Sequence, residues 1–150
     1  MITALQTQIA GWLAADADFA GPPEVPILTE RMGDWLNKLD ITVQQGLGLC
    51  LVVSTPVIAP SGDGPLSVEA AVAIHIWENV VRNMASDGRR LPAPDAALCA
   101  LGALAGREPS GGWSPLQLRK LQLAEAATGS LLMYELVLGT GIRLRVAQVP

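Results

Sequence analysis

The chain has 150 residues and a formal net charge of −4 at neutral pH, and half of its residues are apolar. This length predicts one domain, residues 1–150, with a sizeable core, and the acidic balance argues against a basic nucleic-acid-binding surface. No stretch approaches the roughly 18 charge-free apolar residues of a transmembrane helix, and no basic and apolar leader opens the chain.

The mean hydropathy of +0.35 is high for a soluble monomer. Alanine and glycine account for part of this value, and apolar surface buried in an assembly would account for another part. The two cysteines, Cys50 and Cys99, occur without a CxxC pattern or a neighbouring histidine. We therefore expect two free buried thiols.

Residues 2–19 have the periodicity of an amphipathic helix. The apolar stripe comprises Ile2, Leu5, Ile9, Trp12, Leu13 and Phe19. The sequence Gly-Pro-Pro at 21–23 ends this helix, because proline cannot continue the hydrogen-bond ladder. Residues 25–31 are β-prone, and Pro26 restricts them to an edge strand or the start of a strand.

Residues 33–45 fit two patterns, since Leu39 and Val43 share a helical face and also alternate with Ile41. We expect a short helix or turn up to Asp40, followed by an extended lead-in to the next strand. Residues 47–58 form a nearly continuous apolar run, which favours one buried strand.

Residues 59–65 are rich in glycine and proline, and they join two strand patterns, which predicts a β-hairpin. Residues 66–79 alternate strictly, with aliphatic side chains at every even position from Leu66 to Ile76. This run predicts a central strand with one face on the core. We expect its neighbours to be the 47–58 strand and the last strand of the chain.

Residues 79–91 read as a polar connection, and residues 96–105 as a helix with Asp95 near its N-terminus and Gly106 at its end. The expected apolar face of this helix comprises Leu98, Cys99, Leu101, Leu104 and Ala105.

Residues 116–127 look extended, but the parity of their leucines changes, which a β-bulge at Arg119-Lys120 would explain. A tight turn at 128–130 and a strand over 131–146 complete the chain. The sequence therefore predicts an α+β fold, with a mostly antiparallel mixed sheet of four to five strands. The N-terminal helix and a second helix are expected to pack on one face of it.

Residues that could carry chemistry are few. His75 is the only histidine, and no nucleophile or carboxylate stands at a meaningful sequence spacing from it. We therefore expect a structural or interface role for His75, no catalytic residue, no metal site and no cofactor. The cluster of Arg82, Arg89 and Arg90 fits a solvated loop, an intersubunit salt bridge or a phosphate contact. Trp77 and Trp113 are expected at a partner surface, where tryptophan is enriched.

Three local features, in this order of segments, resemble the tail terminator (tail completion, minor tail) proteins of long-tailed bacteriophages. The first is the N-terminal helix followed by Val-Pro-Ile-Leu-Thr-Glu at 25–30. The second is the strand ending Ile-His-Ile-Trp-Glu-Asn at 74–79. The third is a small Ala/Leu helix, a Trp-Ser-Pro turn at 113–115 and two terminal strands with Tyr134 in the last.

This resemblance implies a structural protein without catalysis, which forms a ring, typically a hexamer, that caps the tail tube. Its partners would be copies of itself, the tail tube protein and a neck or head-tail connector protein. DNA would pass only as cargo, no membrane would be involved, and the protein would move from the host cytoplasm into the tail or neck of the virion. We expect the interface to include Ser61, Gly62, Asp63, Trp77, Glu78, Arg82, Asn83, Arg89, Arg90 and Trp113.

Two alternatives remain open at this point. One is a head-tail joining or neck protein of similar fold. The other is a small α+β enzyme or ligand-binding domain centred on His75 and nearby carboxylates.

Overall fold

The computed structural model describes residues 1–126 and 129–145. Its elements, in chain order, are α1 (Ile2–Ala15), α2 (Ala17–Ala20), β1 (Ile27–Thr29), α3 (Trp35–Gln44), β2 (Leu49–Val53), β3 (Val57–Pro60), β4 (Ser67–Asn79), α4 (Val80–Met84), α5 (Ala93–Leu104), β5 (Gln117–Ala126) and β6 (Leu131–Arg143). This arrangement confirms the α+β class.

The sheet is built around β4, as its alternation predicts. The strand order is β1-β2-β4-β6-β5, and β3 also pairs with β4. Only β1 and β2 run parallel, and β4 pairs with β6 along its whole length, from Ser67 opposite Arg143 to Asn79 opposite Leu131. Both expected neighbours of β4 are confirmed.

The sheet of the described residues has six strands rather than four or five, because the apolar run 47–58 is divided. β2 pairs with residues 74–78 of β4, and β3 pairs with residues 68–71. Three residues, 54–56, therefore lie opposite only two on β4, and the register moves by one residue. Pro56 has no N–H to donate here, so the run bends as a bulge.

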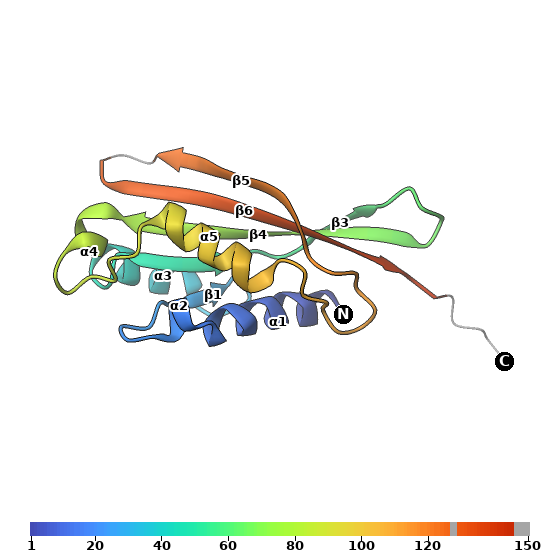
Figure 1. Cartoon of the computed structure of the whole chain (residues 1–150), viewed down its shortest axis with the longest axis horizontal. Helices are drawn as coiled ribbons and strands as arrows, with labels where there is room; N and C mark the ends of the chain where they lie inside the picture. The colour runs from blue at the N-terminus through green and yellow to red at the C-terminus, as the bar shows by residue number, and fades with distance from the viewer. Residues whose placement is uncertain (127–128, 146–150) are drawn as a thin grey trace.

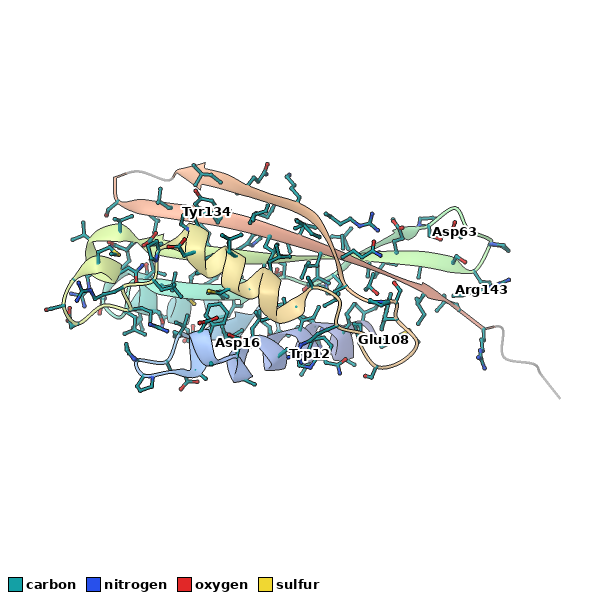
Figure 2. All side chains as sticks on the ribbon, in the orientation of Figure 1. Trp12, Asp16, Asp63, Glu108, Tyr134 and Arg143 are labelled. Atoms are coloured by element: carbon teal, nitrogen blue, oxygen red, sulfur yellow. The ribbon has the colours of Figure 1, made fainter. Side chains whose placement is uncertain are left out.

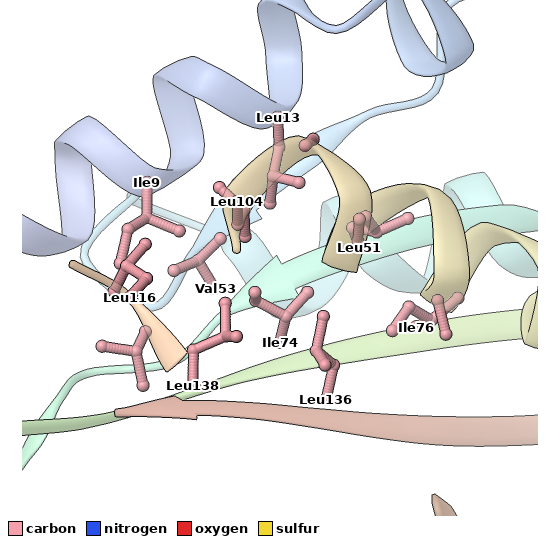
Figure 3. Packing of buried hydrophobic residues seen from close by; sticks show 14 of the residues in the cluster. Ile9, Leu13, Leu51, Val53, Ile74, Ile76, Leu104, Leu116, Leu136 and Leu138 are labelled. Carbon is pink, nitrogen blue, oxygen red and sulfur yellow. The ribbon is translucent and has the colours of Figure 1, made fainter. Parts of the chain in front are cut away.

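One face of the sheet carries the main core, covered by α1 and α5 (Figure 3). The predicted stripe of the first helix is confirmed, since Leu5, Ile9 and Leu13 are buried. This helix is interrupted at Asp16, whose side chain accepts a hydrogen bond from the Asp18 N–H and caps α2.

The face of α5 that packs on the sheet differs from the prediction. Leu98 is 57% exposed, and of the expected face only Leu104 is fully buried. The sheet is instead met by alanines, namely Ala93, Ala96, Ala97, Ala100 and Ala103. Small side chains let a helix approach a sheet closely. The alanines therefore form the centre of the contact between α5 and the sheet, and the leucines other than Leu104 lie at its side.

The prediction that the N-terminal helix and a second helix pack on one face is confirmed by α1 and α5, and the other face is partly covered by a further helix, α3. α3 continues to Gln44, past the predicted end at Asp40. Its Leu39 and Val43 pack against Val52 and Trp77 in a second, smaller cluster. This end of the sheet has apolar side chains on both faces. The second apolar face must also be shielded from water, and α3 shields it.

The remaining elements bear out part of the predicted pattern. The bulge at Arg119 is confirmed, and a second register shift occurs between Leu123 and Glu125. The polar connection after β4 contains the short helix α4. Thr128 in the predicted turn and Val146 at the end of the predicted strand lie outside the described residues.

One end of the sheet extends past the helices (Figure 1). We call residues 57–71, which comprise β3, the turn and the start of β4, the hairpin arm. Ser61 N–H donates to the Ser67 carbonyl at 3.1 Å and closes the predicted hairpin. The arm carries exposed apolar side chains, since Val57 is 69% exposed and Ile58 is 40% exposed.

The two thiols should react at very different rates. Both are free, but Cys50 is buried in β2, and burial raises its pKa to about 12. Burial and the nearby Asp18 also raise the pKa of the half-buried Cys99. Because the thiolate is the reactive form, a thiol reagent at pH 8 should modify Cys99 slowly and Cys50 only after unfolding. Equal rates in the native protein would contradict this expectation.

Candidate functional site

The end of β4 organises the junction between β4, α4 and α5. Glu78 is only 2% exposed, and its Oε1 accepts a hydrogen bond at 3.0 Å from the N–H of Ala93 at the start of α5. Its Oε2 accepts from Asn83 Nδ2, which also donates to the Leu91 carbonyl at 2.8 Å. A carboxylate at a helix N-terminus satisfies an otherwise unpaired N–H and favours the helix dipole.

Glu78 and Asn83 were predicted at an interface, and their burial corrects that placement. Both side chains are buried, and Glu78 and the Asn83 Nδ2 are hydrogen-bonded inside the chain, so they offer no surface to a partner. Position 48 beside them requires glycine. A Cβ on Gly48, where φ is +78°, would lie 2.3 Å from the backbone nitrogen of Asn83. Glu78 and Asn83, which were predicted at an interface, therefore stabilise the fold instead.

Neighbouring residues of the same junction are also engaged. The Asn79 side chain accepts from the Arg82 N–H at 3.2 Å and caps α4. The Arg82 guanidinium donates to the carbonyls of Gln45 and Gly46, both at 3.0 Å, and so stabilises the end of α3. Arg89 donates to the Asp18 carbonyl. In the arginine cluster, Arg82 and Arg89 are partly buried and Arg90 is the exposed member.

The two tryptophans expected at a partner surface lie in different environments. Trp113 is 1% exposed and belongs to the main core, so its predicted surface position was wrong. Its neighbours in sequence are the turn residues glycine, serine and proline, which suggested an exposed position. The turn nevertheless places the Trp113 side chain in the core. Trp77 is half-buried against α3 in the smaller cluster.

His75 lies in a row of polar side chains on the face opposite the main core. Its Nδ1 is 3.3 Å from Ser54 Oγ, and its Nε2 is 3.2 Å from Glu135 Oε2. Lys120 Nζ lies 3.6 Å from the other Glu135 oxygen. The order Ser, His, Glu is that of a nucleophile, a base and an orienting carboxylate.

That row provides little room for a substrate. Ser54 is 9% exposed, and neither Ser54 nor His75 lines any of the main cavities of the described residues. A second polar contact on the same face joins Arg119 to Glu69 at 3.5 Å, with the arginine side chain lying over Gly139. The His75 row links β4 to its neighbour β6, whereas the Arg119–Glu69 pair joins β5 to β4 across the intervening strand β6.

The accessible members of the predicted interface lie at two separate places. Ser61, Gly62 and Asp63 form the turn of the hairpin arm, where Figure 2 places Asp63 at the extended end of the molecule. Arg90 lies beyond β4, next to the α4 junction. The structure therefore does not gather the ten predicted residues into one site.

Several exposed apolar residues were missed by the sequence reasoning. Val81 on α4 is 70% exposed, and Met84 is 46% exposed. The signal was available, since Asn79 is a favourable N-cap and the apolar Val80-Val81 pair follows it. Exposed apolar side chains therefore lie on the hairpin arm and on α4, as well as on α3, α5 and β5.

Within residues 1–126 and 129–145, no three His, Cys, Asp or Glu side chains are grouped so that they could hold a metal ion. The same part of the chain contains no helix with the length and apolar character needed to cross a membrane.

Comparison with known proteins gives a likeness of fold. No protein-family model and no curated protein sequence matches this chain. Among solved structures, a chain from "Virion of native gene transfer agent (GTA) particle" superimposes with a TM-score of 0.63 at 16% sequence identity. The match covers 94% of this chain and 96% of that chain, so the two folds correspond along nearly their whole length.

Proposed function

We propose that this chain is a structural protein of a phage-like virion. The observation that carries the proposal is the likeness to a chain of a gene transfer agent virion across 94% of this chain. The exposed apolar side chains of the hairpin arm and α4 support it, because such residues suit a subunit that buries them against neighbours. The resemblance in sequence to phage tail terminators leads to the same class of protein.

Within the virion, we infer the role of a tail terminator. Copies of the chain would form a ring, a hexamer, that caps the tail tube and presents its other side to the neck or head-tail connector. The net charge of −4 suits a channel that passes DNA, since a basic lumen would hold the phosphates. The chain would assemble in the host cytoplasm and remain in the tail or neck.

The test is direct observation of the oligomer. Light scattering coupled to size-exclusion chromatography should give the mass of a ring, and negative-stain images should show annular particles. A protein that remains a monomer at every concentration, and also after addition of tail tubes, would exclude this role.

The main alternative is a head-tail joining or neck protein. Both would form rings, so the two are separated by what they bind. A terminator should bind the ends of isolated tail tubes, whereas a neck protein should bind the connector and leave the tubes free.

A second candidate function is an enzyme that uses the Ser54–His75–Glu135 row. The hydrogen bonds of His75 favour it, but the near burial of Ser54 favours a structural role. His75→Ala should therefore fold and form rings like the unmodified protein, with only a small loss of stability. Loss of a hydrolytic activity in this variant, with rings intact, would support the enzyme instead.

Shortening the hairpin arm should impair assembly and leave the fold intact. Deleting residues 61–64 removes an exposed turn that lies outside both buried clusters. We expect an unchanged circular dichroism spectrum and few or no rings in negative stain. Ser61→Ala keeps the length of the turn and serves as the control. Normal rings from the shortened protein would contradict a role of the turn in assembly.

A further inference from the structure

One edge of the sheet lies open beside a groove. The groove has a volume of about 500 Å³ and runs between the outer side of α1 and strand β1. Thr7, Gly11 and Ala14 line it from the helix, and Ile27 and Thr29 line it from the strand. Small helix residues leave the space beside the strand free.

The backbone of β1 faces into this groove at alternate residues. Leu51 N–H donates to the Pro26 carbonyl at 3.1 Å, so the backbone groups of Pro26 and Leu28 point towards β2. Those of Ile27 and Thr29 then point outwards, because neighbouring residues of a strand face opposite sides. The Thr29 carbonyl accepts from the Met32 N–H at 3.1 Å, so this edge offers the Ile27 N–H and carbonyl and the Thr29 N–H. An open edge flanked by a helix is the geometry that accepts an added strand from another chain.

The hairpin arm has a matching open edge. Ser61 pairs with Ser67, so the backbones of Ile58 and Pro60 point away from β4, and Ile58 is the one of these two that carries an N–H. The β3 side chains are exposed along its whole length. Asp63 at the turn and Arg31 at the rim of the groove are both exposed and carry opposite charges.

We propose that the hairpin arm of one copy docks in the α1–β1 groove of the next copy and adds β3 to its β1 edge. This contact rests on the proposed ring and identifies the surfaces that build it. Arm and groove are different surfaces, so the contact is head-to-tail, and such contacts close into a ring when the rotation allows. Burial of Val57 and Ile58 would remove apolar surface from water, and the pair Arg31 and Asp63 would fix the orientation.

Disulfide trapping tests the contact. In a Cys99→Ala background, Thr7→Cys is combined in one chain with Ile58→Cys or with Ala59→Cys, whose side chains face opposite sides of β3. Mild oxidation should give a ladder of linked subunits with one of these pairs. Leu98→Cys, an exposed residue of α5, replaces Thr7→Cys in the control and should give no ladder.

Filling the groove supplies a second measurement. Gly11 lies in α1 with nothing within 4 Å of an added Cβ, so Gly11→Leu should fold with an unchanged or higher melting temperature and lose the rings. Gly102→Leu places the same side chain at an equally open glycine of α5 and should keep the rings.

The outcomes separate this contact from the proposed function. Rings that give no ladder with either pair, or that persist in Gly11→Leu, would overturn the docking proposal and leave the ring intact. A ladder without rings would support the docking and exclude the terminator role. The absence of both the ladder and the rings would overturn the docking proposal and the terminator role.

Discussion

Glu78→Ala should lower the free energy of unfolding by about 3 kcal/mol, since hydrogen bonds to a charged group contribute roughly 1.5–3 kcal/mol each. The substitution leaves the Ala93 N–H and one hydrogen of Asn83 Nδ2 without their acceptor in a buried site. It also removes the negative charge from the N-terminus of α5. Urea unfolding followed by circular dichroism measures this loss.

A matched control is available on the same strand. Glu69 is also a glutamate of β4, but its side chain is 49% exposed and pairs with Arg119 at the surface. Glu69→Ala should therefore cost less than about 1 kcal/mol. Equal losses for the two variants would contradict the role given to the Glu78 junction. Glu78→Gln retains an acceptor without the charge and should fall between them.

Trp113→Ala should lower the free energy of unfolding by about 3–5 kcal/mol, the range for truncating a buried aromatic residue. The side chain is 1% exposed and among the largest that are fully buried, and its removal leaves a cavity beside the start of β5. Thermal and urea unfolding of the variant measure the change.

Trp77→Ala is the control for this prediction, because Trp77 is half-buried in the smaller cluster. Its removal should cost about 1–2 kcal/mol, in proportion to the smaller apolar area that it buries. If Trp113→Ala retained full stability and lost only the ability to assemble, this result would support the sequence-based prediction that Trp113 contacts a partner.

The strands could be predicted where their pattern is local. The alternation of residues 66–79 correctly predicted the extent and the buried face of β4, because a strand repeats every two residues whatever surrounds it. The helix stripe through Leu5, Ile9 and Leu13 was equally clear. The bulge at Arg119 followed from the break in parity of the leucines.

The predicted site was less successful, and the errors have one cause. Glu78, Asn83 and Trp113 were taken as surface residues because polar or turn residues surround them in the chain. Each is buried by segments far away in sequence or by a backbone that folds back. Sequence neighbours do not report such contacts, and of the ten predicted residues Gly62, Asp63 and Arg90 are exposed.

By itself, the sequence determined the fold class, the central strand and the hairpin, since these depend on periodicity and turn chemistry within short segments. The tertiary structure alone decided which side chains cover which face of the sheet. It showed that alanines rather than leucines of α5 meet the core, and that Glu78 holds a helix N-terminus. It also showed that the hairpin arm projects past the helices and that a groove lies beside β1, the strand that Pro26 predicted at an edge of the sheet. Burial depends on the whole packed chain, and local pattern therefore cannot specify it.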